Sequence, residues 1–183
     1  SPVLGRPRAV LAHPDGRHIM VAGYPGYGYC GGGMGIVDLE VLDDPAVQRA
    51  MALLFKSQSG VYLERNAGGL IPAIVARQIG AEWVPLLAAG KDGLVYGLAY
   101  RKDSGLITSW IFEFDPRAGK VIASREISQL ILPERLVPGQ SVVTLRALSG
   151  DLLVGGTCVQ TPGGATRQAT EGKLFLFDWK RRK

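Results

Sequence analysis

The sequence lacks long apolar runs and has few cysteines and histidines. No apolar stretch approaches the roughly 18 residues that a membrane-spanning helix requires, so no membrane span is predicted. The two cysteines, Cys30 and Cys158, match no metal-ligand spacing and are expected to be unpaired thiols. No Ser/His/Asp set, carboxylate pair or metal cluster is readable from residue spacing. The sequence therefore predicts no metal, no cofactor and no identifiable catalytic residue, and it leaves enzymatic activity open.

The start of the chain also lacks targeting features. It has neither an initiator Met nor the apolar core of a signal peptide. We therefore expect that the chain was processed, or that it was excised from a longer polypeptide. The localisation stays unknown, with an extracellular or periplasmic one favoured.

Positive charge is concentrated at one end of the chain. The formal net charge is +5, and residues 180–183 supply four of these charges, which leaves +1 for the rest. A nucleic-acid-binding protein normally carries its basic residues as a patch or stripe on the folded surface, so nucleic-acid binding is not expected. The basic tail is interpreted as a solvated chain end or a cleavage site, and a polyanion-binding tail is the alternative.

Glycine is abundant, and it marks an internal repeat. The 25 glycines follow no collagen-like period, which favours many tight turns between short strands. Three segments share an apolar strand, an Asp-Gly or Ser-Gly turn and a second apolar strand that ends in Gly: residues 10–23, 85–97 and 143–156. Each is followed by a third strand that ends in Asp: residues 34–38, 111–115 and 174–178. The distance from the turn glycine to that Asp is 22 residues in the first two copies and 28 in the third, an agreement that chance rarely produces.

The second copy also contains a fourth strand. A turn at residues 116–120 precedes residues 121–127, in which apolar and polar residues alternate as in an outer strand with one solvated face. Four antiparallel strands, with apolar inner ones and a half-polar outer one, form one blade of a β-propeller. The predicted fold class is therefore all-β: a partial β-propeller of about three four-stranded antiparallel blades, with a short helical insertion.

Residues 112–121 carry the pattern aromatic-x-aromatic-Asp-x-x-x-Gly-Lys-Val. This pattern resembles the strand–turn–strand segment of quinoprotein, YVTN-like and kelch-like propellers. The resemblance implies the fold but no single function, because such propellers serve as enzymes, binding platforms and assembly scaffolds. It does not by itself imply a quinone cofactor.

The whole chain, residues 1–183, is expected to be a single partial propeller. Blade 1 is predicted at about 7–60, blade 2 at about 83–128, and blade 3 at about 140–179 without its outer strand. A propeller ring normally has four to eight blades, so three blades leave strand edges open. We expect a second copy of the chain or another chain to complete the ring, unless the chain is a fragment.

Blade 1 is predicted to carry a helical insertion at about 43–82. Asp43, Asp44 and Pro45 are suited to begin a helix, and a second amphipathic piece is predicted at 71–79. The apolar side of the first helix comprises Val47, Met51, Leu54 and Phe55. The insertion is interpreted as a cover over the blade edge, and a partner-binding or ring-closing segment is the alternative.

Three loops are expected to open together on the ligand-binding face of the ring: residues 24–33, 100–105 and 157–168. In the first loop, three tyrosines alternate with glycines and a proline. Such flat rings, each with a hydroxyl, suit stacking on sugars, although these tyrosines also suit packing on the neighbouring blade. The predicted ligand-binding residues are Tyr24, Tyr27, Tyr29, Arg101, Thr157 and Arg167.

Two functions follow from this interpretation. The preferred one is a non-catalytic propeller segment that binds a partner or a ligand such as a carbohydrate. The alternative is an extracellular polysaccharide lyase or hydrolase, in which Tyr27 is the acid/base and Arg101 or Arg167 neutralises a uronate. His13 and His18 flank the first hairpin turn, His-Pro-Asp-Gly-Arg-His, and are interpreted as turn residues rather than catalysts.

Overall fold

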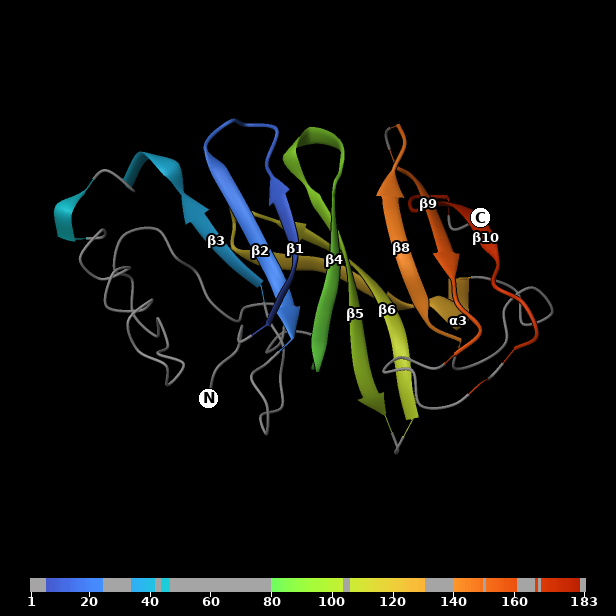
Figure 1. Cartoon of the computed structure of the whole chain (residues 1–183). Coiled ribbons are helices and arrows are strands. Elements are labelled where there is room, and N and C mark those ends of the chain that lie inside the picture. The colour runs from blue at the N-terminus through green and yellow to red at the C-terminus, as the bar shows by residue number, and fades with distance from the viewer. Residues whose placement is uncertain are drawn as a thin grey trace.

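The computed structural model describes residues 6–24, 34–41, 44–46, 80–103, 106–130, 140–149, 151–160, 167 and 169–181. This part of the chain is all-β, as predicted, and its strands form three antiparallel sheets (Figure 1). None of the helices among these residues has the length and apolar character needed to span a membrane.

The first sheet has the strand order β1–β2–β3. Its elements are β1 (Arg6–Ala12), β2 (His18–Tyr24) and β3 (Met34–Asp38), followed by the 3-10 turn η1 (Leu39–Val41). The β1–β2 hairpin passes through Gly16, whose φ of 71° costs glycine no steric clash. Asp15 stabilises the same turn, because its Oδ1 accepts hydrogen bonds from the backbone N–H groups of Arg17 (2.9 Å) and His18 (3.0 Å). The predicted strands of the first repeat are confirmed.

The middle sheet has four strands in the order β4–β5–β6–β7. Its elements are β4 (Trp83–Ala89), the 3-10 turn η2 (Lys91–Gly93), β5 (Val95–Asp103), β6 (Leu106–Asp115), β7 (Lys120–Glu126) and the short helix α3 (Ile127–Leu130). The predicted Asp-Gly turn is confirmed, since Asp92 and Gly93 have φ angles of 57° and 78°. The predicted outer strand is also confirmed as β7, although Ile127 begins α3 and buries its side chain.

The third sheet has the strand order β10–β9–β8. Its strands are β8 (Val142–Ala147), β9 (Leu152–Thr157) and β10 (Leu174–Asp178). They correspond to the three strands predicted for the third repeat. Among the described residues no fourth strand joins this sheet, so β10 is an edge strand.

Most of the predicted helical insertion at 43–82 lies outside the described residues, including its apolar side and the piece at 71–79. At its start, Asp44 Oδ1 accepts a hydrogen bond from the backbone N–H of Ala46 (2.7 Å), as a residue that caps the start of a helix does. Cys30 also lies outside the described residues, and Cys158 is a free thiol, as expected.

The strand register makes the sheets equivalent position by position. Gly97 pairs with Phe112 in the middle sheet, and Gly155 pairs with Phe175 in the third. In both pairs the ring covers the glycine, because an added Cβ atom would lie 2.1 Å from the phenylalanine Cζ. Positions are aligned on the Asp that ends each third strand. Four residues before it, the equivalent residues are Met34, Ile111 and Leu174. Two residues before it, they are Ile36, Glu113 and Leu176.

The middle sheet is buried on both faces. Successive residues of β5 point to opposite sides, so Val95 and Ala99 pack against the first sheet whereas Tyr96 and Leu98 pack against the third. The core shared with the first sheet includes Met20, Ala22, Met34, Ile36, Val84, Phe112 and Phe114. The core shared with the third sheet includes Ile111, Val142, Leu145, Leu153, Phe177 and Trp179.

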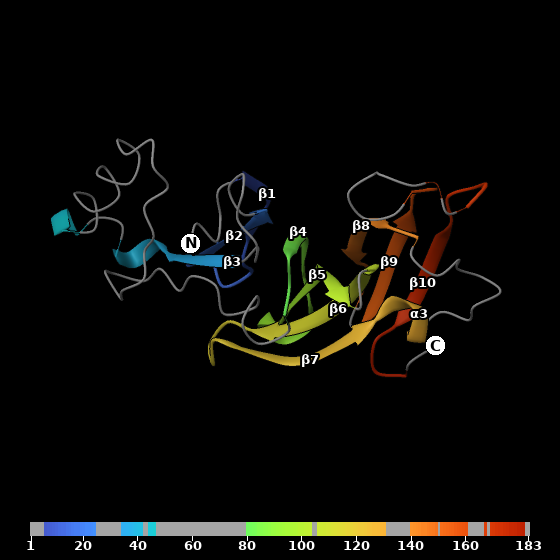
Figure 2. The same ribbon diagram turned by 90° about the horizontal axis from the view of Figure 1, so that it is seen from below.

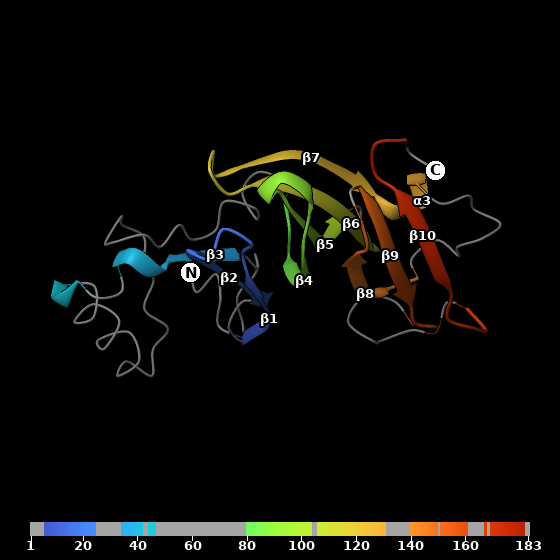
Figure 3. The same ribbon diagram turned by 90° about the horizontal axis from the view of Figure 1, so that it is seen from above.

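The sheets lie side by side through their first strands. β4 contacts β1 and β2 on one side and β8 on the other. Viewed along the strands, β1, β4 and β8 lie at the centre, and the sheets fan outwards to β3, β7 and β10 (Figures 2 and 3). One end of the fan carries the β1–β2 and β4–β5 turns, and the other end carries the ends of β2, β5 and β9 (Figure 1).

Candidate functional site

The predicted ligand-binding residues that the structure describes lie at the end of the fan where β2, β5 and β9 finish. Tyr24 ends β2, Arg101 lies near the end of β5, and Thr157 ends β9. Arg167 lies in the segment between β9 and β10. Tyr27 and Tyr29 lie outside the described residues, so their role stays a prediction.

Tyr24 belongs to an aromatic group with two arginines. Its ring centroid lies 5.7 Å from that of Trp83, and Trp83 lies edge-on to Tyr100 at 5.9 Å. The guanidinium groups of Arg6 and Arg8 lie over the Tyr24 ring at 5.4 and 5.3 Å. Tyr24 and Trp83 are half-buried, so this group presents apolar rings and positive charge at the surface. We call Tyr24, Trp83, Arg6 and Arg8 the aromatic–arginine group.

The buried Tyr100 supports this group through its ring contact with Trp83. Its hydroxyl donates a hydrogen bond to the carbonyl oxygen of Val142 (2.6 Å) and lies 3.1 Å from the Ser141 hydroxyl. Burial raises the pKa of Tyr100 to about 12. The Tyr100 hydroxyl therefore stays protonated and ties the middle sheet to the third.

The other predicted residues have partners elsewhere. The Arg101 guanidinium stacks on Trp110 at 4.1 Å. Thr157 is buried, and its hydroxyl oxygen accepts hydrogen bonds from Gln140 Nε2 (2.8 Å) and the backbone N–H of Lys173 (2.9 Å). Arg167 is exposed and donates to two carbonyl oxygens, of Ala169 (3.1 Å) and Thr170 (3.4 Å). These contacts hold Arg101, Thr157 and Arg167 in place, and each is made with a residue outside the aromatic–arginine group.

Sequence reasoning missed Trp83, Arg6 and Arg8. Trp83 opens β4, and Arg6 and Arg8 lie in β1, whereas the predicted group came only from the segments that follow second strands. The first strand of each sheet begins at the end of the fan where the second strand finishes. Basic or aromatic residues at the start of a first strand could therefore have been predicted to lie near Tyr24.

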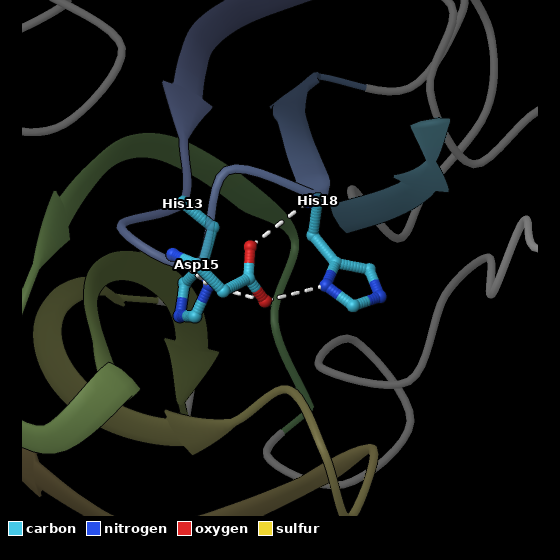
Figure 4. A group of neighbouring side chains, drawn as sticks. All are labelled: His13, Asp15 and His18. Carbon is cyan, nitrogen blue, oxygen red and sulfur yellow. Dashed lines mark hydrogen bonds and ion pairs between the residues drawn. The ribbon is translucent and has the colours of Figure 1, made fainter. Parts of the chain in front are cut away.

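The opposite end of the fan carries a cluster of titratable side chains. His13, Asp15 and His18 converge at the β1–β2 turn, with the Asp15 carboxylate between the two imidazole rings (Figure 4). Asp15 Oδ2 lies 2.8 Å from His13 Nδ1 and 2.7 Å from His18 Nδ1. Hydrogen bonding to His18 is the largest of the effects that hold the pKa of Asp15 far below its usual range. The sequence showed these residues only as turn formers, although the spacing His-x-Asp-x-x-His was present.

His13 also connects two sheets. Its side chain is buried, and its Nε2 lies 2.7 Å from the carbonyl oxygen of Gly93 in the middle sheet. Beside the cluster, Arg17 pairs with Asp38, its Nε donating to Asp38 Oδ1 (2.8 Å), and Arg17 Nη1 lies 2.7 Å from Glu40. The hydrogen bond from Arg17 lowers the pKa of Asp38. The positive charge of Arg17 is thus neutralised by the carboxylates of Asp38 and Glu40.

A polar network crosses between the middle and third sheets. Glu113 accepts a hydrogen bond from Trp179 Nε1 (3.0 Å). The single hydroxyl proton of Tyr96 is shared between Glu113 (3.3 Å) and Asp151 (3.1 Å). Lys180 pairs with Asp151 at 3.0 Å. Burial, followed by the nearby Glu113 and Asp151 carboxylates, raises the pKa of Tyr96. Lys180, predicted as part of a solvated tail, is therefore ion-paired to the third sheet.

The outer face of the third sheet carries exposed apolar side chains on β10. Leu174 is 85% exposed and Leu176 is 62% exposed. The strand register places Gly156 beside Leu174 and Val154 beside Leu176 on the same face. On the other side of β9, the exposed Thr144 and Arg146 of β8 lie beside Gly156 and Val154 on this face. We call these six residues the outer face of the third sheet.

Comparison with known proteins identifies no relative, since no family model, no curated protein and no solved structure matches the chain.

Proposed function

We propose that the chain is a non-catalytic, partner-binding segment of a β-propeller. Three features support the propeller arrangement. The first strands β1, β4 and β8 lie next to one another, the sheets fan outwards from them, and the Gly–Phe pairs recur at equivalent positions. Each is expected of blades that stack around a common axis.

The observation that carries the proposal is a difference between equivalent residues. Ile111 in the middle sheet is 0% exposed because the third sheet covers it, whereas its equivalent Leu174 is 85% exposed. Met34, the equivalent residue of the first sheet, is buried against the middle sheet. A face that is covered in two sheets and that presents exposed leucines in the third is suited to bind a further sheet of the same kind.

A second copy of the chain is the partner that we propose for this face. The outer face of its first sheet offers Val10, which is 71% exposed, and the register places Ile19 and Val21 on the same side. This surface is apolar and occupies the position that packs on a preceding sheet in the other two repeats. Two copies joined in this way would contain six sheets, within the four to eight blades of propeller rings.

Measuring the mass in solution over a range of concentrations tests this proposal. We expect the chain to associate to twice its 19.6 kDa. The double variant Leu174→Asp/Leu176→Asp should remain a monomer, because burying two carboxylates in an apolar contact is costly. Ile122→Asp, which alters an exposed apolar residue of β7, is the matched control and should associate like the unaltered chain. A compact monomer at every concentration would contradict the proposal.

The aromatic–arginine group supports a second candidate function, the binding of an acidic carbohydrate. Half-exposed Tyr24 and Trp83 rings suit stacking on sugar faces, and Arg6 and Arg8 supply positive charge for a uronate carboxylate. On an array of neutral and uronate-containing glycans, Trp83→Ala should lose binding and Lys102→Ala, at the same end of the fan, should keep it. New ultraviolet absorbance from unsaturated chain ends would instead favour the lyase alternative.

A further inference from the structure

We propose that His13, Asp15 and His18 form a binding site for a divalent transition-metal ion of the zinc class. Each residue offers one ligand atom, and these atoms all lie within 4.8 Å of one another. Imidazole nitrogen and carboxylate oxygen are typical ligands of Zn²⁺ and Co²⁺.

The hydrogen bonds of His13 specify its tautomer. A carbonyl oxygen only accepts, so the 2.7 Å contact with Gly93 places the imidazole proton on Nε2. A neutral ring then carries its lone pair on Nδ1, in agreement with the long contact of 3.4 Å that Nδ1 receives from the backbone N–H of Asp15. The buried ring is thus held with its free nitrogen directed at the Asp15 carboxylate.

This arrangement needs a cation. His13 Nδ1 lies 2.8 Å from Asp15 Oδ2, and lone pairs on both atoms repel at that distance unless a proton or a metal ion lies between them. His18 Nδ1 approaches the same oxygen to 2.7 Å. Two imidazole nitrogens and one carboxylate oxygen thus converge, and this set of atoms can hold either shared protons or a Zn²⁺ ion.

The surroundings also suit a metal. Metal-binding histidines usually donate their second N–H to a backbone carbonyl or a carboxylate, and the Gly93 carbonyl has this role for His13. Asp15 Oδ1 is occupied by the backbone N–H groups of Arg17 and His18, which leaves Oδ2 for the ion. The neighbouring Arg17 is balanced by Asp38 and Glu40, so its charge opposes cation binding only weakly.

The geometry requires small movements of both imidazole rings. A tetrahedral ion with bonds of about 2.0 Å needs ligand atoms about 3.3 Å apart. The two Nδ1 atoms lie 2.8 and 2.7 Å from Asp15 Oδ2, so each nitrogen must move away from that oxygen by about 0.5 Å. The His18 side chain is partly exposed and can also turn towards the ion. Three protein ligands leave the fourth position open to water or to a ligand atom from a bound molecule.

A metal ion at this site would link the first hairpin to the middle sheet. His13 belongs to the β1–β2 turn, and its ring contacts the β4–β5 turn at Gly93. Because the ion would bind only the folded arrangement of the three ligands, it should stabilise the fold in proportion to its concentration.

Titrating the chelator-treated chain with Co²⁺ and Zn²⁺ tests the proposal. We expect one Co²⁺ per chain with the visible absorption of a four- or five-coordinate site, displacement by Zn²⁺, and a melting temperature that rises with Zn²⁺ concentration. His18→Ala and Asp15→Asn should weaken Zn²⁺ binding at least tenfold. His18 is partly exposed, so its replacement should leave the fold intact.

A matched control separates this site from thiol binding. Cys158 is a free thiol and can bind these metals, so Cys158→Ser should bind Co²⁺ like the unaltered chain. Equal Zn²⁺ affinity in the unaltered chain and in His18→Ala would overturn the proposal. So would a melting temperature that does not respond to Zn²⁺, because a proton would then be the cation between His13 and Asp15.

Discussion

The middle and third sheets have the same Gly–Phe pairing on the face that packs on the preceding sheet, and they differ on the opposite face. Gly97 lies beneath Phe112 as Gly155 lies beneath Phe175. On the opposite faces, Ile111 is covered and its equivalent Leu174 is not. The difference supports the proposal that a further sheet covers the outer face of the third sheet.

The largest difference between the two sheets is expected for Ile111→Ala and Leu174→Ala. Truncating the buried Ile111 should lower the free energy of unfolding by about 2–5 kcal/mol, because it removes packed methyl groups and leaves a cavity. Truncating the exposed Leu174 should change it by less than about 0.5 kcal/mol. Urea denaturation at a concentration where the chain is monomeric measures both values. Equal losses would show that Leu174 is covered within one chain.

The two glycines provide a second comparison. Gly97→Ala should cost about 1–3 kcal/mol, because the new methyl group meets the fully buried Phe112 ring. Gly155→Ala should cost less, since Phe175 is only partly buried and lies on the edge strand β10, where its ring can shift. Urea denaturation of both variants gives the order. If Gly155→Ala costs more, β10 is held more firmly than an edge strand.

Tyr100 and Tyr24 compare a buried hydroxyl with one near the surface. Tyr100→Phe should destabilise the fold by about 1 kcal/mol, because the Val142 carbonyl oxygen loses a buried donor. Tyr24→Phe, at the same end of the fan, should have an effect below about 0.5 kcal/mol. Thermal unfolding measures both, and equal effects would remove the anchoring role assigned to Tyr100.

The smallest expected effect concerns Asp151, which belongs to the polar network between the middle and third sheets. Burial raises the pKa of Asp151, but hydrogen bonds from Lys180 and Tyr96 outweigh burial and lower the pKa below its usual value. Because the folded-state pKa is the lower one, this stabilisation is present at neutral pH and is lost as the pH falls below about 4. Asp151→Asn should therefore cost less than about 1 kcal/mol at pH 7, and this difference should shrink at pH 3. A difference that is the same at both pH values would contradict the ionic interpretation.

The strands were predictable from the sequence because their determinants are local. Asp-Gly and Ser-Gly turns, apolar runs and a recurring terminal Asp mark nine of the ten strands in the described part of the chain, and alternation of apolar and polar residues marks β7. The repeat itself was needed to align them. Its equivalences hold in the pairing of Gly97 with Phe112 and of Gly155 with Phe175.

The candidate sites were less predictable because they depend on contacts between distant segments. Trp83 meets Tyr24 only because β4 packs beside β2, and His13 meets Gly93 across 80 residues of chain. Thr157 was predicted as a ligand-binding residue from its loop position alone, and its hydrogen bonds to Gln140 and Lys173 depend on how three strands converge. Residue spacing along the chain does not show which distant segments come into contact.

The outward faces of the first and third sheets differ from each other, and this difference has a consequence for assembly. A contact between the third sheet of one copy and the first sheet of the next is heterologous, so each added copy presents the same unsatisfied face again. If the rotation between copies closes after two, the product is a discrete ring. If the rotation misses closure, the same contact propagates into an open helical filament. If copies associate as proposed, small changes in twist at the β4–β8 and β1–β4 contacts would decide between a closed ring and a fibre.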